Sequence, residues 1–241
     1  MDFWGDVLLL MLKEDIEKLE KILKIDFHDK NLLRTAITHS SYANQKNIQY
    51  NERLEFLGDS VLQIVISEYL FLNYKDKTEG ELSKKRALIV CENSLFKIAN
   101  SWHLGKYIFM SKGEEITGGR TRVSILSDCV EAIIAAIYLD KGFEFSKEFI
   151  LSNFQKIIEM AMKNQIILDY KTRLQEVLQK NGDADIKYKL LKFEGPPHRR
   201  KFYISVAFNG TLKGEGTGFS KKEAEQDAAQ TALKTIGELY E

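Results

Sequence analysis

The chain has few cysteines, few prolines and no excess of charge of either sign, and each shortage excludes a class of protein. Its two cysteines, Cys91 and Cys129, lie far apart and form no CxxC pair. This spacing excludes a disulfide framework and a cysteine zinc site, and it indicates a reducing compartment, the cytoplasm. Lysine plus arginine and aspartate plus glutamate each total 35, so the net charge indicates no polyanionic partner. Such a partner can be inferred only from local clusters of charge.

A long hydrophobic run is also lacking. The most apolar stretch near the start, residues 7–12, follows Asp2 and Asp6 and runs directly into further charged residues. It is too short for a membrane span and no basic segment precedes it. We therefore interpret it as a helix face, and we expect neither a signal peptide nor a membrane anchor.

Both prolines stand at positions 196 and 197, so none interrupts a helix in the first two thirds of the chain. In that part, apolar residues such as Leu19, Ile22 and Leu23 recur at helix spacing, and glycine is scarce. Hydrophobic residues make up 44% of the chain, which is enough to bury a core. The pattern predicts an all-α domain of roughly seven or more helices over residues 1–165.

The rest of the chain has a different pattern, which predicts a small α+β domain over residues 169–241 with no Gly/Ser/Pro-rich linker before it. We expect a helix, three alternating segments and a second helix, at residues 170–180, 188–193, 201–208, the stretch after the hairpin signal Asn209-Gly210, and from Ser220 to about residue 239. Asn181-Gly182 is a suitable C-cap for the first helix. The α-β-β-β-α order resembles the layout of a double-stranded RNA-binding domain.

One predicted helix gathers three negative charges on a single face. In residues 51–60, at 100° per residue, Glu52, Glu55 and Asp59 fall within an arc of about 60°. Apolar residues occupy the opposite side. Like charges on one helix face repel one another, and more strongly where water is excluded. Taken alone, this face is equally well explained as a solvated acidic surface.

A second predicted helix carries two charges that a solvated acidic surface does not explain. Residues 127–139 are apolar around nearly the full circumference, as in a central buried helix, and their only charges are Asp128 and Glu131. Two buried carboxylates without a partner cost several kcal/mol at least, about the penalty of an unpaired buried charge. A hard divalent cation such as Mg²⁺ is the simplest compensation. The alternative is a buried salt bridge to an arginine such as Arg53 or Arg86.

Together these segments resemble ribonuclease III. Residues 51–60 read as the signature of that family, and residues 38–44, 79–83 and 124–132 also fit it. The resemblance covers about residues 16–236. It implies the all-α ribonuclease III endonuclease fold, followed by the double-stranded RNA-binding fold.

The resemblance assigns roles to single residues of the first domain. It implies a metal site for Mg²⁺, which Mn²⁺ can replace, made by Glu55, Asp59, Asp128 and Glu131. Asp59 and Glu131 are the least replaceable catalytic residues, while Glu52 and Glu79 act around the site. By itself the segment around Glu79 predicts only a helix start with basic residues on a solvent face. Phe56 stands off the apolar stripe of its helix, and in the family this aromatic fills a cavity of the other subunit. The alternative is an ordinary core phenylalanine.

The activity that the resemblance implies is metal-assisted hydrolysis of double-stranded RNA. Products carry 5′-phosphate and 3′-hydroxyl ends, and a two-fold homodimer leaves short 3′ overhangs. Ribosomal RNA precursors and structured messenger RNAs are the substrates expected from the family, with no membrane and no small-molecule cofactor. The four histidines, at positions 28, 39, 103 and 198, are too widely spread to suggest a catalytic triad or a zinc set.

The second domain carries the expected RNA contacts. Polar side chains that face outward from its first helix suit the shallow minor groove of A-form RNA, although taken alone they are better explained as an ordinary wet helix face. Lysines in the first turn of its last helix suit phosphates. The residues concerned are Thr172, Gln175 and Glu176, then Pro197 and His198 of the loop at 195–200, then Lys221, Lys222 and Gln226. Asp185 and Glu225 reduce the positive charge of this surface.

Two other functions fit part of the sequence. A non-catalytic double-stranded RNA-binding protein would keep the fold but not the chemistry, and the presence of all six acidic residues speaks against it. An all-helical Mg²⁺-dependent nucleotide hydrolase also gathers carboxylates on facing helices. It would have no use for a duplex-binding domain.

Overall fold

The computed structural model describes residues 14–166, 169–180, 185–196 and 200–238. The chain divides between Gln165 and Ile166 into a helical unit and an α-β unit. This confirms the predicted fold class, an all-α domain followed by a small α+β domain. Several predictions lie outside the described residues, namely the helix face at 7–12, the Asn181-Gly182 cap, Pro197 and His198.

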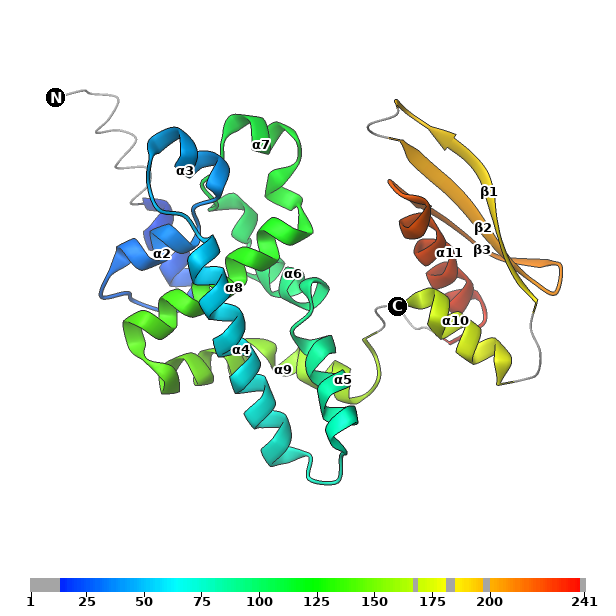
Figure 1. The fold of residues 1–241 in the computed structure, drawn as a ribbon, viewed down its shortest axis with the longest axis horizontal. Helices are drawn as coiled ribbons and strands as arrows, with labels where there is room; N and C mark the ends of the chain where they lie inside the picture. The colour runs from blue at the N-terminus through cyan, green and yellow to red at the C-terminus, as the bar shows by residue number, and fades with distance from the viewer. Residues whose placement is uncertain (1–13, 167–168, 181–184, 197–199, 239–241) are drawn as a thin grey trace. The chain divides into compact units, whose positions relative to one another are not determined.

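The helical unit consists of helices joined by short turns (Figure 1). Residues 14–23 are helical. The helices that follow are α2 (Lys30–Ala36), α3 (Ser40–Lys46), α4 (Glu52–Asn73), α5 (Glu79–Ile89), α6 (Glu92–Ser101), α7 (Lys112–Ile116), α8 (Val123–Lys141) and α9 (Phe143–Met162). Two 3₁₀ turns, η1 (Leu104–Lys106) and η2 (Gly119–Thr121), flank α7. No helix in the described ranges combines the length and the apolarity that a membrane crossing requires.

Helix α8 is the centre of the helical unit, as its apolar circumference predicts. Its buried residues run almost without interruption from Ile125 to Ile137. The long helix α4 packs along it, and α2, α6 and α9 pack around it. A helix enclosed in this way removes most of its apolar surface from water, and that burial is the main source of its stability.

The closest approach of α4 to α8 occurs at Gly58. A Cβ atom built on Gly58 would lie 1.8 Å from the backbone oxygen of Glu131, so only a residue without a side chain fits there. The two helices therefore pack backbone against backbone at this level. Because Asp59 adjoins Gly58 in sequence, this contact brings the acidic residues of both helices to the same place.

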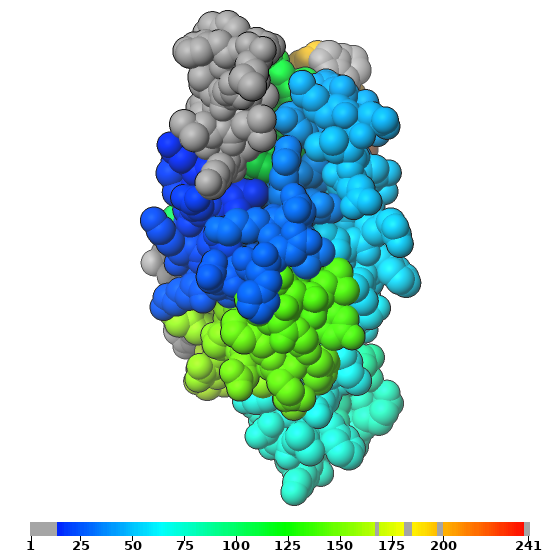
Figure 2. Space-filling model, turned by 90° about the vertical axis from the view of Figure 1, so that its left-hand side faces the viewer, coloured from blue at the N-terminus to red at the C-terminus, as the bar shows by residue number. Residues whose placement is uncertain are grey.

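Hydrogen bonds connect the end of α8 to the residues just before α2. Asp140, whose side chain is almost fully buried, accepts hydrogen bonds from the backbone N–H groups of His28 (2.9 Å) and Asp29 (2.8 Å). Asp29 in turn caps α2 by accepting from the backbone N–H of Asn31. Figure 2 shows these distant parts of the sequence, the blue N-terminal segment and the green junction of α8 and α9, side by side.

The α-β unit is a three-stranded antiparallel sheet in the order β1-β2-β3, with α11 packed on β2 and β3 and α10 packed on α11 (Figure 1). Its elements are α10 (Tyr170–Gln179), β1 (Ile186–Glu194), β2 (Lys201–Phe208), β3 (Thr211–Gly218) and α11 (Lys221–Thr235). The predicted hairpin is confirmed, because Asn209 and Gly210 both have positive φ angles, 46° and 77°, between β2 and β3. The closing helix ends at Thr235 rather than near residue 239, because Gly237 turns left-handed with φ 76° and stops it.

Helix α11 lies directly on β3 because alternate residues of that strand are glycines. A Cβ atom on Gly216 would lie 2.0 Å from the backbone N of Ala228, and one on Gly214 would lie 2.5 Å from the backbone O of Ala228. The helix presents alanines, including Ala224 and Ala232, to the same surface. This contact of glycine with alanine sets the distance between β3 and α11.

Candidate functional site

Four carboxylates face one another, those of Glu55 and Asp59 on α4 and of Asp128 and Glu131 on α8. Among them, the pKa of Glu131 departs most from its ordinary value. Burial, and then the charges of Asp59, Glu55 and Asp128, raise the pKa of Glu131 to about 8. No cation is among the groups that set this pKa. A glutamic acid that stays protonated near neutral pH is a sign that negative charge has been concentrated where water is partly excluded.

The other members of the cluster show the same crowding. Burial raises the pKa of Glu55, and the charges of Asp128, Glu52 and Asp59 add to the rise. Burial also raises the pKa of Asp128, with a further contribution from Glu92 that the charge of His39 partly offsets. The carboxylates that the helical periodicity of α4 and the apolar circumference of α8 single out therefore influence one another's pKa values.

The arginine alternative receives no support. Arg86 Nη1 donates to Ser67 Oγ (2.9 Å), while Arg53 is exposed. Within the described ranges, neither arginine forms an ion pair with Asp128 or Glu131. The prediction of a basic solvent face on α5 is partly wrong, because only Lys84 is exposed. Lys85 turns inward, and its Nζ donates to the backbone O of Ala161 and to Asn164 Oδ1, both at 2.6 Å, at the end of α9.

Two residues that shape the cluster were missed from the sequence. Gln63, one turn after Asp59 on α4, donates from Nε2 to both carboxylate oxygens of Asp59 at 2.9 and 3.1 Å. This spacing of four residues was available as a signal, because side chains four apart are neighbours on a helix. Gly58 is the second, and its role depends on the position of α8, which no pattern within α4 reveals.

The donor set fits a hard divalent cation in its chemistry. Its members are carboxylates, they repel one another, and a doubly charged ion would offset that repulsion. As the side chains stand, the described residues contain no group of three or more His, Cys, Asp or Glu at distances that would hold one ion. Binding therefore requires side-chain torsions to change within the cluster, which the partial exposure of Glu55, Asp59 and Asp128 allows.

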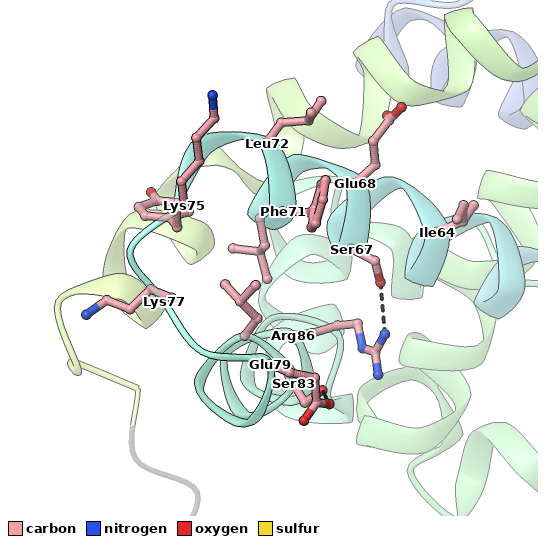
Figure 3. A pocket seen from close by; sticks show the side chains of 13 residues that line it. Ile64, Ser67, Glu68, Phe71, Leu72, Lys75, Lys77, Glu79, Ser83 and Arg86 are labelled. Atoms are coloured by element: carbon pink, nitrogen blue, oxygen red, sulfur yellow. Dashed lines mark hydrogen bonds between the residues drawn. The ribbon is translucent and has the colours of Figure 1, made fainter.

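Glu52 and Glu79 stand apart from the four. Glu52 is exposed on the acidic face of α4 and contributes to the pKa values of Glu55 and Asp128. Glu79 is the first residue of α5, where its Oε1 accepts from Ser83 Oγ (2.8 Å). It lines a separate pocket of about 830 Å³ between the end of α4 and α5. Figure 3 shows Glu79 and Ser83 across that pocket from Phe71 and Leu72.

Phe56 is not a core phenylalanine of this chain. Its side chain is 79% exposed, and two further apolar residues of α4 are also largely exposed, Ile64 at 54% and Phe71 at 70%. On a helix these three residues lie within an arc of about 80°, so they form one apolar stripe along α4. Large exposed apolar side chains on one face of a helix are typical of a protein contact surface.

The α-β unit places most of the expected RNA contacts on its surface. Thr172, Gln175 and Glu176 are exposed on α10, and Lys221 and Lys222 are exposed in the first turn of α11. A polar hollow of about 640 Å³ lies between these helices and the start of β1, lined by Thr172, Gln175 and Lys222 among others.

Asp185 and Glu225, which were expected to reduce the positive charge of this surface, are each paired with a lysine. Glu225 Oε2 lies 2.7 Å from Lys171 Nζ, and Asp185 Oδ2 lies 2.6 Å from Lys187 Nζ. Gln226 differs from the exposed candidates, because its amide points to the start of α10 and is hydrogen-bonded there.

Comparisons with family models and with individual proteins agree with one another. The model of a family described as Ribonuclease-III-like matches residues 29–158, and that of the double-stranded RNA binding motif matches residues 170–236. The Ribonuclease 3 of Clostridium kluyveri is 64% identical over 221 residues, which is 91% of each chain. That of Clostridium tetani is 65% identical over 223 residues, covering 92% of this chain and 95% of the relative.

Solved structures extend the comparison to the helical unit. A structure of the nuclease domain of ribonuclease III from Campylobacter jejuni is 54% identical, with a TM-score of 0.56. It covers 58% of this chain and 96% of that domain, which has a region involved in dimer formation. The likeness therefore includes both the fold and the residues of the helical unit.

Proposed function

Because the chain belongs to the ribonuclease III family, we propose that it cuts double-stranded RNA at the carboxylate cluster of α4 and α8. The chain is a metal-dependent, double-strand-specific endoribonuclease, and the metal proposed is Mg²⁺, with Mn²⁺ as a substitute. The observation that carries the assignment of the site is the crowding of Glu131 by three other carboxylates with no cation among the groups that set its pKa.

In this proposal Glu55, Asp59, Asp128 and Glu131 hold the ion. Bound Mg²⁺ would supply an activated water and would stabilise the leaving 3′ oxygen. Gln63 donates to both carboxylate oxygens of Asp59 in the structure, so it is placed to orient that carboxylate beside the ion. Glu52 and Glu79 act at its margin, where an exposed carboxylate can accept hydrogen bonds from water or from ribose hydroxyls.

The products proposed are 5′-phosphate and 3′-hydroxyl ends with short 3′ overhangs, made by a two-fold homodimer. The exposed apolar stripe of α4, which includes Phe56, supports a contact between two copies of the chain. Ribosomal RNA precursors and structured messenger RNAs are the proposed substrates. We place the endonuclease domain at residues 1–165 and the double-stranded RNA-binding domain at residues 169–241.

The first experiment compares substrates. Labelled duplex RNA, a matched duplex DNA and nucleoside triphosphates are each incubated with the protein, with and without Mg²⁺. We expect only duplex RNA to be cut, and only with Mg²⁺. Binding of duplex RNA without any cleavage would favour a non-catalytic binding protein, and hydrolysis of a triphosphate would favour a nucleotide hydrolase.

The second experiment tests the site itself. Glu131→Gln removes one ligand charge with little change of volume, and we expect it to reduce Mg²⁺-dependent cleavage about a thousandfold, equivalent to several kcal/mol of transition-state stabilisation. Binding of duplex RNA in EDTA should not change. The control is Glu148→Gln, an exposed carboxylate on α9, which should cut at the native rate. Undiminished cleavage by Glu131→Gln would show that the metal site has been misplaced.

A further inference from the structure

The side-chain amide of Gln226 makes three hydrogen bonds within the α-β unit. Its Oε1 accepts hydrogen bonds from the backbone N–H groups of Tyr170 (2.7 Å) and Lys171 (3.4 Å). Its Nε2 donates to Asp169 Oδ1 (2.8 Å). A glutamine in the middle of α11 thus satisfies the unpaired N–H groups at the start of α10, which a helix leaves without partners of its own. Little of its hydrogen-bonding capacity is left for a ligand.

Asp169 connects this amide to an exposed residue of α10. It is the N-cap of α10, and its two oxygens accept from the backbone N–H (3.0 Å) and the hydroxyl (2.9 Å) of Thr172. The hydrogen bond from Gln226 is the main reason that the pKa of Asp169 falls to about 2. Gln226, Asp169 and Thr172 therefore form one connected set of hydrogen bonds.

Other contacts reinforce the same junction. Lys171 Nζ pairs with Glu225 at 2.7 Å and lies 4.8 Å from the ring centre of Tyr188 on β1. Gln230 Nε2 donates to Tyr170 Oη at 3.3 Å. The first turn of α10 is thus held against the first half of α11, at the hollow that Thr172, Gln175 and Lys222 also line.

We infer that Gln226 is a positioning residue, which holds the minor-groove side chains of α10 and the phosphate-binding lysines of α11 at a fixed spacing, instead of touching RNA itself. This inference rests on the proposed RNA-binding function of the unit. It departs from the sequence-based assignment of Gln226 as an RNA contact. A rigid spacing between these two groups of side chains is what recognition of duplex shape requires, because the minor groove and its flanking phosphates have a fixed geometry in A-form RNA.

The test uses the salt dependence of binding by the full-length protein. Binding of a duplex RNA of roughly 20 base pairs, long enough for the footprint of one such domain, is measured in EDTA over a series of salt concentrations. Gln226→Met keeps the length of the side chain and removes its hydrogen bonds. We expect affinity to fall about tenfold, within the range of a coupled contact, and the salt slope to shrink by about one phosphate contact because Lys222 is displaced. Loss of a neutral side chain that touches RNA directly would leave the slope unchanged.

A double-mutant cycle provides a second readout. Asp169→Ser keeps an N-cap for α10 but is too short to reach Gln226. If both residues act through one set of hydrogen bonds, the double variant binds no more weakly than the weaker single variant. The matched control is Gln155→Met, an exposed glutamine on α9 outside the α-β unit, and we expect its affinity within about twofold of native.

The outcomes separate this inference from the function on which it rests. Suppose that the native protein binds duplex RNA, that the losses of affinity caused by Gln226→Met and Asp169→Ser add in the double variant, and that the salt slope does not change. Gln226 is then a direct RNA contact, and the inference is overturned. Native affinity in Gln226→Met would overturn it too. Failure of the native protein to bind duplex RNA would instead overturn the RNA-binding function of the unit.

Discussion

At the scale of single residues, Glu131 opposes folding as long as no cation is bound. Its carboxyl is half-buried beside Asp59, Glu55 and Asp128, so its ionised form is less stable in the folded protein than in the unfolded chain. A site of this kind gives up stability for function. The same crowding that disfavours the empty site is available to favour a bound divalent ion.

This leads to a prediction about pH and stability in the absence of metal. The folded-state pKa of Glu131, about 8, lies above the ordinary value of 4.5. Between these values the folded state binds more protons than the unfolded state, so stability falls as pH rises through that window. Glu131→Gln should flatten this dependence. We expect it to raise the free energy of unfolding by about 1–2 kcal/mol near pH 8.5, a figure reduced from the full shift because the group is partly exposed.

Urea unfolding in EDTA, followed from about pH 5 to pH 9, measures this effect. Glu148→Gln is the control, because an exposed carboxylate on α9 should reproduce the native dependence on pH. If the native protein and Glu131→Gln had parallel stability curves, Glu131 would not be the residue that titrates. Added Mg²⁺ should stabilise the native protein more than Glu131→Gln, since a ligand that binds the folded state shifts the unfolding equilibrium.

The site residues differ in how far a sequence can reveal them. Glu55 and Asp59 could be grouped because they share a helix, and helical periodicity is a property of the chain itself. Asp128 and Glu131 could be singled out because charges are rare in an apolar helix. The hydrogen bonds of the Gln226 amide could not be predicted, because all three partners lie more than fifty residues earlier and two of them are backbone groups.

At the scale of elements, the packing of α4 on α8 depends on one residue without a side chain. Gly58 lies against the backbone of Glu131, and the overlap that a Cβ would cause, at 1.8 Å, involves main-chain atoms that cannot rotate away. The same contact fixes the separation of the carboxylates on the two helices. Stability of the helical unit and geometry of the site are therefore set together at this position.

We predict that Gly58→Ala separates α4 from α8 and impairs both properties. The free energy of unfolding should fall by about 3 kcal/mol, the upper end of the cost of overpacking, and Mg²⁺-dependent cleavage should fall with it. Gly80→Ala is the matched control, since a Cβ on Gly80 meets nothing within 4 Å. It should leave stability unchanged or raise it by up to about 1 kcal/mol, because alanine favours helix more than glycine does. Equal stability of the two variants in urea would contradict the close approach.

Element boundaries follow from the sequence where the local chemistry is decisive. The limits of β2 agree with the prediction, because alternating side chains end at the Asn209-Gly210 turn. The end of α11 was predicted too late, although a signal was present. After Gly237 turns left-handed, the backbone N–H of Glu238 donates to the O of Leu233 and closes the helix.

At the scale of the whole molecule, the helical unit exposes an apolar surface that a single chain does not bury. The stripe of Phe56, Ile64 and Phe71 runs along α4, and Ile64 and Phe71 also line the pocket between α4 and α5 that Figure 3 shows. The sequence indicated an unusual position for Phe56, because it stands off the apolar side of its helix. It did not indicate the extent of the stripe, since the exposure of Ile64 and Phe71 depends on which faces of α4 the other helices cover.

If two copies of the chain associate through this stripe, Phe56→Arg should produce a monomer. Burying a phenylalanine contributes roughly 2 kcal/mol, and a two-fold interface loses that contribution twice. The total, about 4 kcal/mol, weakens association roughly a thousandfold. Sedimentation velocity across a range of protein concentrations would measure the change, with Phe219→Arg as the control, because Phe219 is 62% exposed and lies in the α-β unit. Phe56→Arg should also lower double-strand cleavage at low protein concentration, and a variant that still sediments as a dimer would place the interface elsewhere.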